Sequence, residues 1–403
     1  MSATSTCSST YSEKKSRWKT CGDLTPHTDL FRPKLSASSP PITRSRRIFE
    51  NAGDDIDVVA ILNGSHVDPN FFYVSGYKSG LFEGNLLFLF SDGHVEVLTN
   101  RLEEGAAREK KEFEVHVERS SDPAERRKTM SSILKGCARV GINFQGVSHR
   151  DYEELEKTLR TKELVDVSDA LRKSRMVKDP DELDAISKAS KIISSVVDRV
   201  PEMAKEGMTE KELKGEVDYV IVKEGADSPS FDSIVAFGEN SAIPHHAAGE
   251  RRLRRGDNVL IDAGARYNLY CSDITRTFFF GHAERAQNEV YAKVLEAQAS
   301  GLDAIRAGVR GSAIHGIAAR VIDESKFRGK FTHGLGHSIG LEVHDGPALS
   351  PRNRDRLEEN MVLTVEPGIY QLGKGGVRIE DDVVVTKDSC RQLTTSTKEL
   401  LVI

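Results

Sequence analysis

The sequence predicts an α/β protein of two domains, and three observations support this prediction. The chain has 403 residues, whereas a single domain usually holds about 100–200 residues. Residues 48–172 alternate short apolar runs with turns and two helical stretches, which is typical of an α/β domain. Residues 173–403 contain two successive segments, 180–280 and 281–403, and each has two helical stretches followed by strand-rich sequence.

The composition indicates a globular protein of the cytoplasm. Hydrophobic residues make up 38% of the chain and charged residues 30%. No apolar run approaches the roughly 20 residues that a membrane-spanning helix needs, so no membrane contact is expected. The five cysteines are scattered and never form a CxxC pair. This pattern argues against a disulfide framework and against a zinc ribbon.

Charge is distributed unevenly along the chain. Residues 1–47 hold nine Lys or Arg and three Asp or Glu, a balance of +6, so the total of −5 leaves −11 for residues 48–403. Nucleic-acid binding is not expected of such an acidic body, because phosphate affinity comes from clustered basic side chains. The one dense basic cluster, GERRLRRGDN at 249–258, is expected to cap a surface hairpin rather than bind phosphate.

Residues 1–47 are predicted to form a disordered extension. Seventeen of them are Ser or Thr, and the segment lacks both a hydrophobic periodicity and the apolar core of about 7–15 residues that marks a secretory signal. A basic, hydroxyl-rich and acid-poor composition is also typical of an organellar transit peptide. An upstream start codon that adds a dispensable extension is a third explanation.

Local patterns predict the elements of residues 48–172. The segment GNLLFLFSDGHVEVLTN, residues 84–100, predicts a β-hairpin because an Asp-Gly turn separates two apolar strands. Further strands are expected at DVVAIL, NFFYVSGY and ARVGINF, and helices at 122–135 and 149–160. No metal or nucleophile site is evident in this domain. Its expected role is packing, oligomerisation or the formation of one wall of a cleft.

The second domain, residues 173–403, is expected to open with a long helix. Asp179 suits the N-cap and Pro180 the first helical position, and four apolar residues line one face of the helix, namely Leu183, Ile186, Ile193 and Val197. TEKE at 209–212 is a capping box that opens the next helix. Two more helices, near 285–307 and 312–325, separate the strand-rich segments 231–280 and 331–403. The two halves, meeting face to face, would enclose one cleft.

Two aspartates form the first candidate pair for chemistry. In NVLIDAGARYNLYCSDITRTF, a predicted reversal at residues 267–269 separates Asp262 from Asp273, so the two can lie on facing strands of one hairpin. Two buried carboxylates side by side need a shared proton or a bound cation. The structural alternative is that Asp262 forms a turn and Asp273 pairs with Arg276.

The segment THGLGHSIGLEVHDG, residues 332–346, contains three histidines and four glycines. His333 and His337 have the i, i+4 spacing of a helical zinc site, but Gly334 and Gly336 disfavour a helix and no Glu follows His333. The helical zinc motif is therefore excluded. Two interpretations remain: a glycine-rich bend that directs imidazoles into a cleft, or loop histidines with ordinary hydrogen-bond partners.

Two glutamates lie at apolar strands near the C-terminus. Glu366 in MVLTVEPGIY follows an apolar run that Pro-Gly ends, so its carboxylate needs a partner. Glu380 in GGVRIEDDVVV lies on the same face of its strand as Arg378, two residues earlier. Taken alone, this second pair is explained as a structural ion pair.

Five of these groups together suit a metal centre. They are Asp262, Asp273, His337, Glu366 and Glu380. Four carboxylates and one imidazole make a site rich in oxygen, which suits two divalent ions such as Mn²⁺ or Co²⁺ better than thiolate-bound zinc. Two ions that share bridging carboxylates activate water near neutral pH, so hydrolysis is the predicted reaction class.

Five motifs in order, NSAIPHH, IDAGARYNLYCSDITRTF, HGLGHSIGLEVHD, TVEPGIY and GVRIEDD, give the chain a family resemblance. It resembles the proline-specific pita-bread metallopeptidases, which are Xaa-Pro aminopeptidase and Xaa-Pro dipeptidase (prolidase). The resemblance covers residues 48–403 and implies a creatinase-like N-terminal domain at 48–172. It also implies a pita-bread catalytic domain at 173–403 with two pseudo-twofold halves, each of two helices and strands.

The resemblance implies a role for each of the five ligands. Asp262 would bind the first metal ion, and Asp273 and Glu380 would bridge both ions. His337 and Glu366 would complete the second site, and Glu366 would also act as the general base.

The resemblance further implies residues that act on the substrate. His344 would contact the substrate carbonyl and stabilise the tetrahedral intermediate, and His245 would contact the substrate and relay a proton. His333, Arg378 and Tyr370 would surround the pocket that accepts proline. Glu342 and Asp345 are left as structural residues.

The expected activity is hydrolysis of the Xaa-Pro bond at the N-terminus of peptides or in dipeptides, with two Mn²⁺ or Co²⁺ ions and a homodimeric enzyme. Proline at the second position requires a dedicated pocket, because its imide nitrogen has no hydrogen. Methionine aminopeptidase-like activity is an alternative, although those enzymes lack the N-terminal domain and usually the arginine at the place of Arg378. The other alternative is a non-catalytic metal-binding interaction protein of the same fold.

Overall fold

The computed structural model describes residues 40–53 and 55–403, and its first domain is built on one six-stranded sheet. The sheet has the order β4-β3-β2-β1-β5-β6. The elements of this domain, in chain order, are α1 (Pro40–Ala52), β1 (Val58–Asn63), α2 (Pro69–Ser75), β2 (Asn85–Phe90), β3 (Val95–Asn100), α3 (Glu104–Ala107), β4 (Glu114–Glu118), α4 (Pro123–Ile133), β5 (Arg139–Ile142), α5 (His149–Thr158), β6 (Glu163–Asp166) and α6 (Ser168–Met176).

This sheet is buried on both faces. Val59 and Ile61 of β1 belong to one core cluster, whereas their neighbours Val58 and Ala60 belong to another, because successive side chains of a strand point to opposite faces. The predicted hairpin at 84–100 is confirmed as β2 and β3, which pair in antiparallel fashion. The predicted helices at 122–135 and 149–160 are confirmed as α4 and α5, and ARVGINF contains β5.

The strand predicted for NFFYVSGY is wrong, because most of this segment forms the helix α2. The side chain of Asp68 caps the helix by accepting a hydrogen bond from the backbone N–H of Asn70, and Pro69 occupies the first turn. Gly76 ends the helix in the left-handed conformation with φ of 62°. The start signal at Asp68 and the stop signal at Gly76 outweigh the strand preference of the aromatic residues between them.

The predicted disordered extension is wrong for its last residues, because α1 begins at Pro40. Arg44 is 4% exposed and donates to Asp179, and Arg47 donates to the same carboxylate at 2.5 Å. These basic residues therefore pair with acids of the folded body. The prediction for residues 1–39 lies outside the described residues.

The boundary predicted between residues 172 and 173 lies within α6, which ends at Met176. The long helix α7 then begins at Pro180, with Asp179 and Glu182 forming a capping box. The break between the two domains is therefore the short segment between these helices. Asp179 both caps α7 and accepts the Arg44 and Arg47 bonds that join α1 to this segment.

The second domain consists of two halves, each of helices followed by strands, as predicted. The first contains α7 (Pro180–Asp198), α8 (Val200–Met203), α9 (Glu210–Lys223), β7 (Ser228–Pro229), β8 (Ile234–Phe237), the 3₁₀ helix η1 (Gly238–Ala242), β9 (Asn258–Ala263), β10 (Ala265–Tyr267), β11 (Tyr270–Cys271) and β12 (Ile274–Phe279). The second contains α10 (Arg285–Ala304), α11 (Gly311–Asp323), β13 (Val362–Val365), β14 (Gly368–Gln371), β15 (Gly375–Arg378), β16 (Asp381–Val385) and β17 (Cys390–Gln392).

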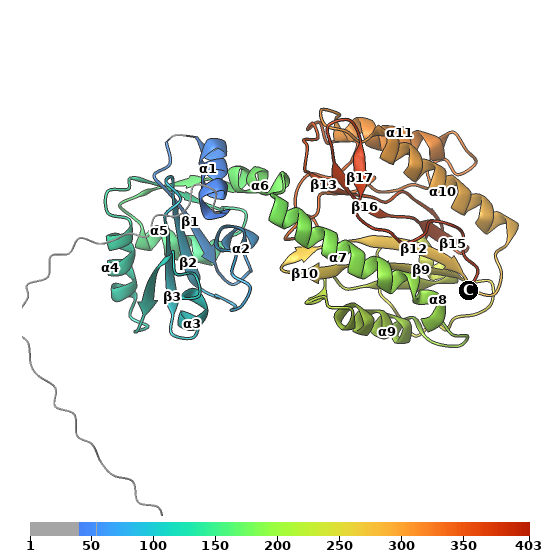
Figure 1. The fold of residues 1–403 in the computed structure, drawn as a ribbon, viewed down its shortest axis with the longest axis horizontal. Helices are drawn as coiled ribbons and strands as arrows, with labels where there is room; N and C mark the ends of the chain where they lie inside the picture. The colour runs from blue at the N-terminus through green and yellow to red at the C-terminus, as the bar shows by residue number, and fades with distance from the viewer. Residues whose placement is uncertain (1–39, 54) are drawn as a thin grey trace, which may run out of the picture. The chain divides into compact units, whose positions relative to one another are not determined.

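Figure 1 shows the strands of this domain between the α7–α9 group and the α10–α11 pair. The capping box from Thr209 to Glu212 is confirmed at the start of α9. The two halves meet where the backbone N–H of Glu380 donates to the carbonyl of Thr275 at 3.1 Å. Residues 332–361 contain no strand, and isolated bridges such as Ser338 with Leu363 connect them to the rest of the domain.

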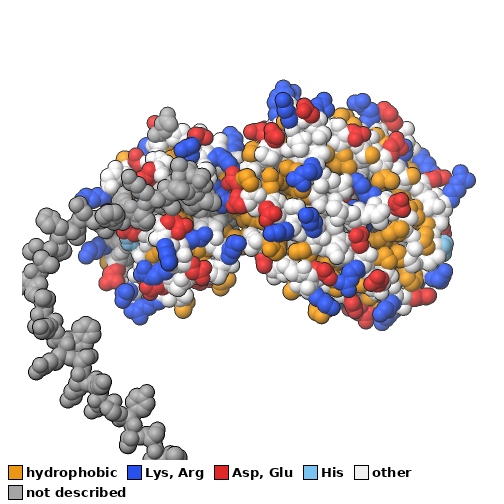
Figure 2. Space-filling model, viewed as in Figure 1, with side chains coloured by type: hydrophobic (Ala, Val, Ile, Leu, Met, Phe, Trp, Pro, Cys, Tyr) orange, Lys and Arg blue, Asp and Glu red, His pale blue; other side chains and the backbone are white. Residues whose placement is uncertain are grey.

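On the face drawn in Figure 2, basic and acidic side chains are interspersed. The basic segment 249–258 leads into β9, which begins at Asn258, and Arg251 donates to Asp257 at 2.7 Å. In the described part of the chain, no helix is both long and apolar enough to cross a membrane.

Candidate metal centre

The carboxylates of the predicted centre lie at the ends of strands from both halves. Asp262 belongs to β9, Asp273 directly precedes β12, and these strands are antiparallel with Asp262 opposite Thr275. The reversal between them is sharp, because Asn268 and Leu269 both have positive φ angles, of 48° and 78°. The hairpin predicted for this segment is therefore present.

Glu366, Glu380 and His337 come from the second half. Glu366 directly follows β13, and Glu380 lies between β15 and β16. His337 lies in the irregular segment ahead of β13, where a Cβ at Gly336 would fall 1.9 Å from the carbonyl oxygen of Thr364. Glycine at this position therefore lets the loop approach β13 closely enough to place His337 beside the carboxylates.

Three of these side chains form a compact group. Asp273, His337 and Glu380 each offer one ligand atom, and these atoms lie within 4.8 Å of one another. His337 Nε2 lies 3.7 Å from Asp273 Oδ2 and 3.5 Å from Glu366 Oε1. The three residues are 4%, 9% and 2% exposed, so little of the group's surface contacts solvent.

The electrostatics of this group favour a bound cation. Burial raises the pKa of Asp273, Glu366 and Glu380 well above the usual carboxyl range, and the neighbouring carboxylates add to the effect. Burial, together with nearby His344, lowers the pKa of His337 to about 4, so its imidazole is neutral. A divalent cation would hold the carboxylates ionised, and a neutral imidazole is a suitable ligand.

Buried oxygen atoms without partners support the same conclusion. Among the described residues, Asp262 Oδ1 and Asp273 Oδ1 are buried without a hydrogen-bond donor. Unpaired buried carboxylate oxygens are costly unless a cation binds them. The residues present thus fit divalent metal ions, with an oxygen-rich donor set and one nitrogen.

The two ion pairs considered as structural alternatives, Asp273 with Arg276 and Glu380 with Arg378, are not the pairs that these arginines form. Arg276, offered as the partner of Asp273, instead donates to Asp381 at 2.8 Å. Arg378, offered as the partner of Glu380, donates to Asp262 Oδ2. Glu380 accepts a hydrogen bond from Thr275 Oγ1 at 2.6 Å.

A cavity of about 210 Å³ opens beside the carboxylates. It is lined by Pro244, His245, Asp262, His333, Gly334, Gly336, His337, His344, Ala348, Glu366 and Arg378. Seven of the ten predicted site residues therefore share one cavity. The other three are Asp273 and Glu380, which belong to the buried group, and Tyr370, which bonds to the cavity wall.

One wall of the cavity is a hydrogen-bonded chain. His333 Nε2 lies 2.8 Å from Tyr370 Oη, which in turn accepts from Arg378 Nη1 at 3.0 Å. Burial, with the nearby charge of Arg378, lowers the pKa of His333 to about 4. A neutral imidazole and a fixed guanidinium therefore face the cavity from this side.

Sequence reasoning missed residues that hold this site in place. Thr275 Oγ1 donates to Glu380 and accepts from Arg378 Nε at 3.0 Å. Thr275 lies two residues after Asp273 and so on the same face of the chain, and this spacing could have predicted that it lies near the carboxylates. Glu210, 0% exposed, accepts hydrogen bonds from His246 Nε2 at 2.8 Å and from three other donors around the loop that contains His245. No local pattern marked Glu210.

The acids left as structural residues form ion pairs. Asp345 Oδ2 lies 2.8 Å from Lys178 Nζ, and Arg175 Nη2 lies 2.8 Å from Asp345 Oδ1 and 2.9 Å from Glu342 Oε2. Asp345 directly follows His344, so these pairs fix the loop that presents this imidazole to the cavity.

Comparison with known proteins covers both domains. Residues 184–387 match the model of metallopeptidase family M24, and residues 42–177 match the model of the creatinase/prolidase N-terminal domain. An Xaa-Pro dipeptidase of Pyrococcus horikoshii is 37% identical over 351 residues, which are 86% of this chain and 95% of the relative.

Solved structures agree with this match. The X-Pro aminopeptidase of Thermotoga maritima superposes with a TM-score of 0.82 at 35% identity and covers 89% of this chain and 100% of its own. The prolidase of Pyrococcus horikoshii gives a TM-score of 0.81 at 35% identity, with 90% of this chain and all of that one covered.

Proposed function

This chain belongs to metallopeptidase family M24, and on that premise we propose that it hydrolyses the peptide bond between an N-terminal residue and proline. The observation that supports this most directly is the cavity in which a buried carboxylate group lies beside the His333–Tyr370–Arg378 chain. The similar proteins described as an Xaa-Pro dipeptidase, an X-Pro aminopeptidase and a prolidase support the same substrate class.

The proposed ligands are the five predicted residues. Asp262, Asp273 and Glu380 would hold one ion, and Asp273, Glu380, His337 and Glu366 the other. Such ions, when bound, polarise a carbonyl and lower the pKa of water. Mn²⁺ or Co²⁺ is proposed because the donor set holds four carboxylates and one imidazole without a thiolate.

Three side chains of the cavity are proposed to act on the reacting groups. Glu366 accepts a proton from the attacking water, and it is the carboxylate that both lines the cavity and contacts His337. His344 donates its N–H to the carbonyl oxygen as negative charge develops there. His245, on the opposite loop, contacts the substrate and delivers a proton toward the leaving proline nitrogen.

The His333–Tyr370–Arg378 chain is proposed to form the proline pocket. Proline has no N–H to offer a general peptide-binding strand, so recognition must rely on ring contacts and on the groups around its carbonyl or carboxylate. Arg378 is fixed by Asp262, Thr275 and Tyr370, and a fixed guanidinium suits a carboxylate.

Longer peptides are a second candidate substrate. His344 lines the 210 Å³ cavity and also a wider cleft of about 600 Å³, whose wall includes His66, Asn70 and Gln145 of the first domain. This cleft offers space for residues beyond proline, which an Xaa-Pro-Yaa substrate would need.

A direct assay tests the proposal. The protein, loaded with Mn²⁺ or Co²⁺, is incubated with Ala-Pro, Ala-Pro-Ala and the control Ala-Ala, and released alanine is measured. We expect hydrolysis of proline substrates and little of Ala-Ala, with loss of activity on chelation. Turnover of Ala-Pro alone identifies a dipeptidase, and turnover of Ala-Pro-Ala identifies an aminopeptidase. Inactivity on both proline substrates with metal bound would contradict the proposal.

We further propose a homodimer in the cytoplasm. The family resemblance supports the dimer, and the scattered cysteines, of which Cys137, Cys271 and Cys390 are free thiols, support a reducing compartment. Light scattering after size-exclusion chromatography would measure the oligomeric state.

A further inference from the structure

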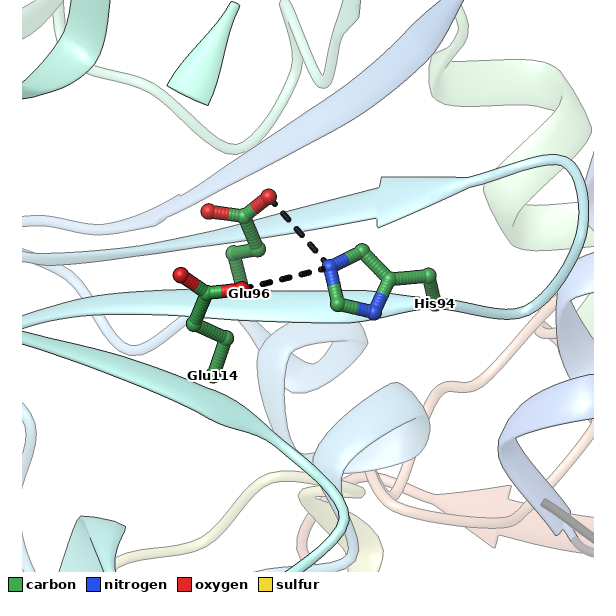
Figure 3. Close-up of side chains that lie close together, drawn as sticks. All are labelled: His94, Glu96 and Glu114. Atoms are coloured by element: carbon green, nitrogen blue, oxygen red, sulfur yellow. Dashed lines mark hydrogen bonds and ion pairs between the residues drawn. The ribbon is translucent and has the colours of Figure 1, made fainter. Parts of the chain in front are cut away.

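The first domain contains a second cluster of metal-ligating side chains, on the strands β3 and β4 at one edge of its sheet. Glu96 of β3 is paired with Glu114 of β4 in a parallel register, and Leu98 with His116. His94 directly precedes β3. Alternate residues of an extended chain share a face, so His94 and Glu96 face the same way as Glu114 and His116 of β4. Figure 3 shows His94 directed toward both carboxylates.

The distances within this cluster suit a tetrahedral ion. His94 Nε2 lies 3.3 Å from Glu96 Oε1 and 3.9 Å from Glu114 Oε2. Three atoms of these residues lie within 4.8 Å of one another. In a tetrahedral zinc site with bonds of about 2.0–2.1 Å, ligand atoms are about 3.3 Å apart. Small side-chain adjustments would therefore close the group around one ion.

His116 adds an outer contact. Its Nε2 lies 2.6 Å from Glu96 Oε2 and 3.6 Å from Glu114 Oε1. Ligating carboxylates are usually held by such outer hydrogen bonds, which fix their orientation. The other oxygen of Glu96, Oε1, lies 3.3 Å from His94 Nε2.

Burial and charge favour a cation here. Glu96 is 8% exposed, whereas the side chain of Glu114 is 54% exposed, so the cluster is anchored on one side and open to solvent on the other. Among the residues that the structure describes, no lysine or arginine forms an ion pair with either carboxylate. Burial opposes ionisation of Glu96, but hydrogen bonds with His116 and His94 lower its pKa to about 2.

We propose that His94, Glu96 and Glu114 bind one zinc ion, with His116 orienting Glu96 and water completing the coordination. Nitrogen and oxygen ligands at this spacing are those that zinc prefers. The site lies on a domain that supplies none of the five proposed ligands of the catalytic centre. It therefore adds a metal-binding function beyond the proposed peptidase activity.

Metal counting tests this proposal on the full chain. The protein is dialysed to equilibrium against Zn²⁺ near neutral pH, and zinc per chain is measured by mass spectrometry. The double variant His94→Gln/Glu114→Gln should bind one zinc ion fewer than the unaltered protein while keeping its melting temperature and its Ala-Pro hydrolysis. His116→Gln should weaken this ion's binding about 10–100-fold.

A matched control is available on α5 of the same domain. His149 Nε2 lies 3.5 Å from Glu153 Oε1 in an exposed pair, and no other carboxylate of the described residues pairs with this histidine. His149→Gln/Glu153→Gln removes the same residue types and should bind as much zinc as the unaltered protein. Equal zinc content in all three proteins, or an equal loss in both double variants, would overturn the proposal and leave the cluster as imidazole–carboxylate ion pairs only.

Discussion

Lys178 Nζ lies 2.8 Å from Asp345 Oδ2, although 167 residues separate the two. Lys178 is 2% exposed and Asp345 is 1% exposed. Lys178 lies in the segment between α6 and α7, and Asp345 directly follows His344. The pair therefore ties the break between the domains to the loop that presents His344 to the cavity.

Removal of one partner of this pair is expected to be strongly destabilising. Asp345→Asn should lower the free energy of unfolding by about 3–5 kcal/mol, because it leaves the buried ammonium of Lys178 without its counter-charge. Urea unfolding followed by circular dichroism measures the loss. As a control, Asp169→Asn removes an exposed partner of Arg172 at 3.3 Å and should cost about 0–1 kcal/mol. A similar small cost for both variants would show that the buried pair contributes little.

Glu366→Gln is expected to abolish turnover but not folding. The substitution keeps the shape of the side chain and removes the proposed proton acceptor, so kcat for Ala-Pro should fall about 10²–10⁴-fold. In the chelated protein the free energy of unfolding should not fall, because a neutral group replaces a carboxyl whose pKa burial has raised. Glu359→Gln, at an exposed position, is the control, and it should leave kcat unchanged. An active Glu366→Gln enzyme would refute the assignment of the base.

Tyr370→Phe is expected to weaken catalysis through the proline pocket. The ring stays in place, but the hydroxyl that links His333 to Arg378 is lost. We expect kcat/KM for Ala-Pro to fall about tenfold, which corresponds to roughly 1.4 kcal/mol, as for one lost hydrogen bond to a charged group. Tyr219→Phe, where the side chain is 63% exposed, should have no effect. An unchanged kcat/KM in Tyr370→Phe would show that the Tyr370 hydroxyl has no role in the proline pocket.

Metal removal is expected to make stability depend on pH. In the chelated protein, burial raises the pKa of Asp273, Glu366 and Glu380, so the folded state retains protons that the unfolded state has released. The free energy of unfolding should therefore fall as the pH rises above about 4, the range of unperturbed carboxyls, toward the raised values.

Added Mn²⁺ should reverse this trend, because the ion binds the ionised carboxylates. The melting temperature should rise more on adding Mn²⁺ near pH 8 than near pH 5, since protons compete with the metal at the lower pH. Differential scanning calorimetry measures both shifts. An equal rise at the two pH values would contradict the assignment of these carboxylates as ligands.

Glu210→Gln is expected to destabilise the protein at neutral pH and to matter less in acid. Burial opposes ionisation of Glu210, but hydrogen bonds from His246, the Phe237 backbone and Asn240 outweigh it and lower the pKa. A lowered carboxyl pKa gives stability that is present above the unfolded pKa of about 4.3 and is lost as the pH falls through the folded value.

The variant should therefore lose about 1–3 kcal/mol near pH 7, the usual worth of a hydrogen bond to a charged group, and this gap should narrow below about pH 4. Urea unfolding across this pH range measures the gap. Glu216→Gln, exposed on the same helix, should show no pH-dependent gap. A gap that is constant with pH would indicate that the carboxylate charge contributes nothing.

Much of the fold follows from signals a few residues apart. The hairpin at 84–100, the capping box from Thr209 to Glu212 and the start of α7 at Pro180 were all predictable, because turns and caps are local hydrogen-bonded units. The error at NFFYVSGY was also local. The Asp68 cap and the Gly76 stop were present in the sequence, and they decided the helix against the strand preference of its aromatic residues.

The sequence also determined which side chains are suited to bind metal. Carboxylates at the ends of buried strands need a cation or a proton, and a nearby imidazole can serve as a further ligand. Only the tertiary structure decided how they are partnered. Arg378 bonds to Asp262, 116 residues away, and not to the nearby Glu380, while Thr275 bonds to Glu380 across the meeting line of the two halves. Such pairings depend on which strands pack together, and the register between distant strands is fixed by the whole core, not by any local stretch of sequence.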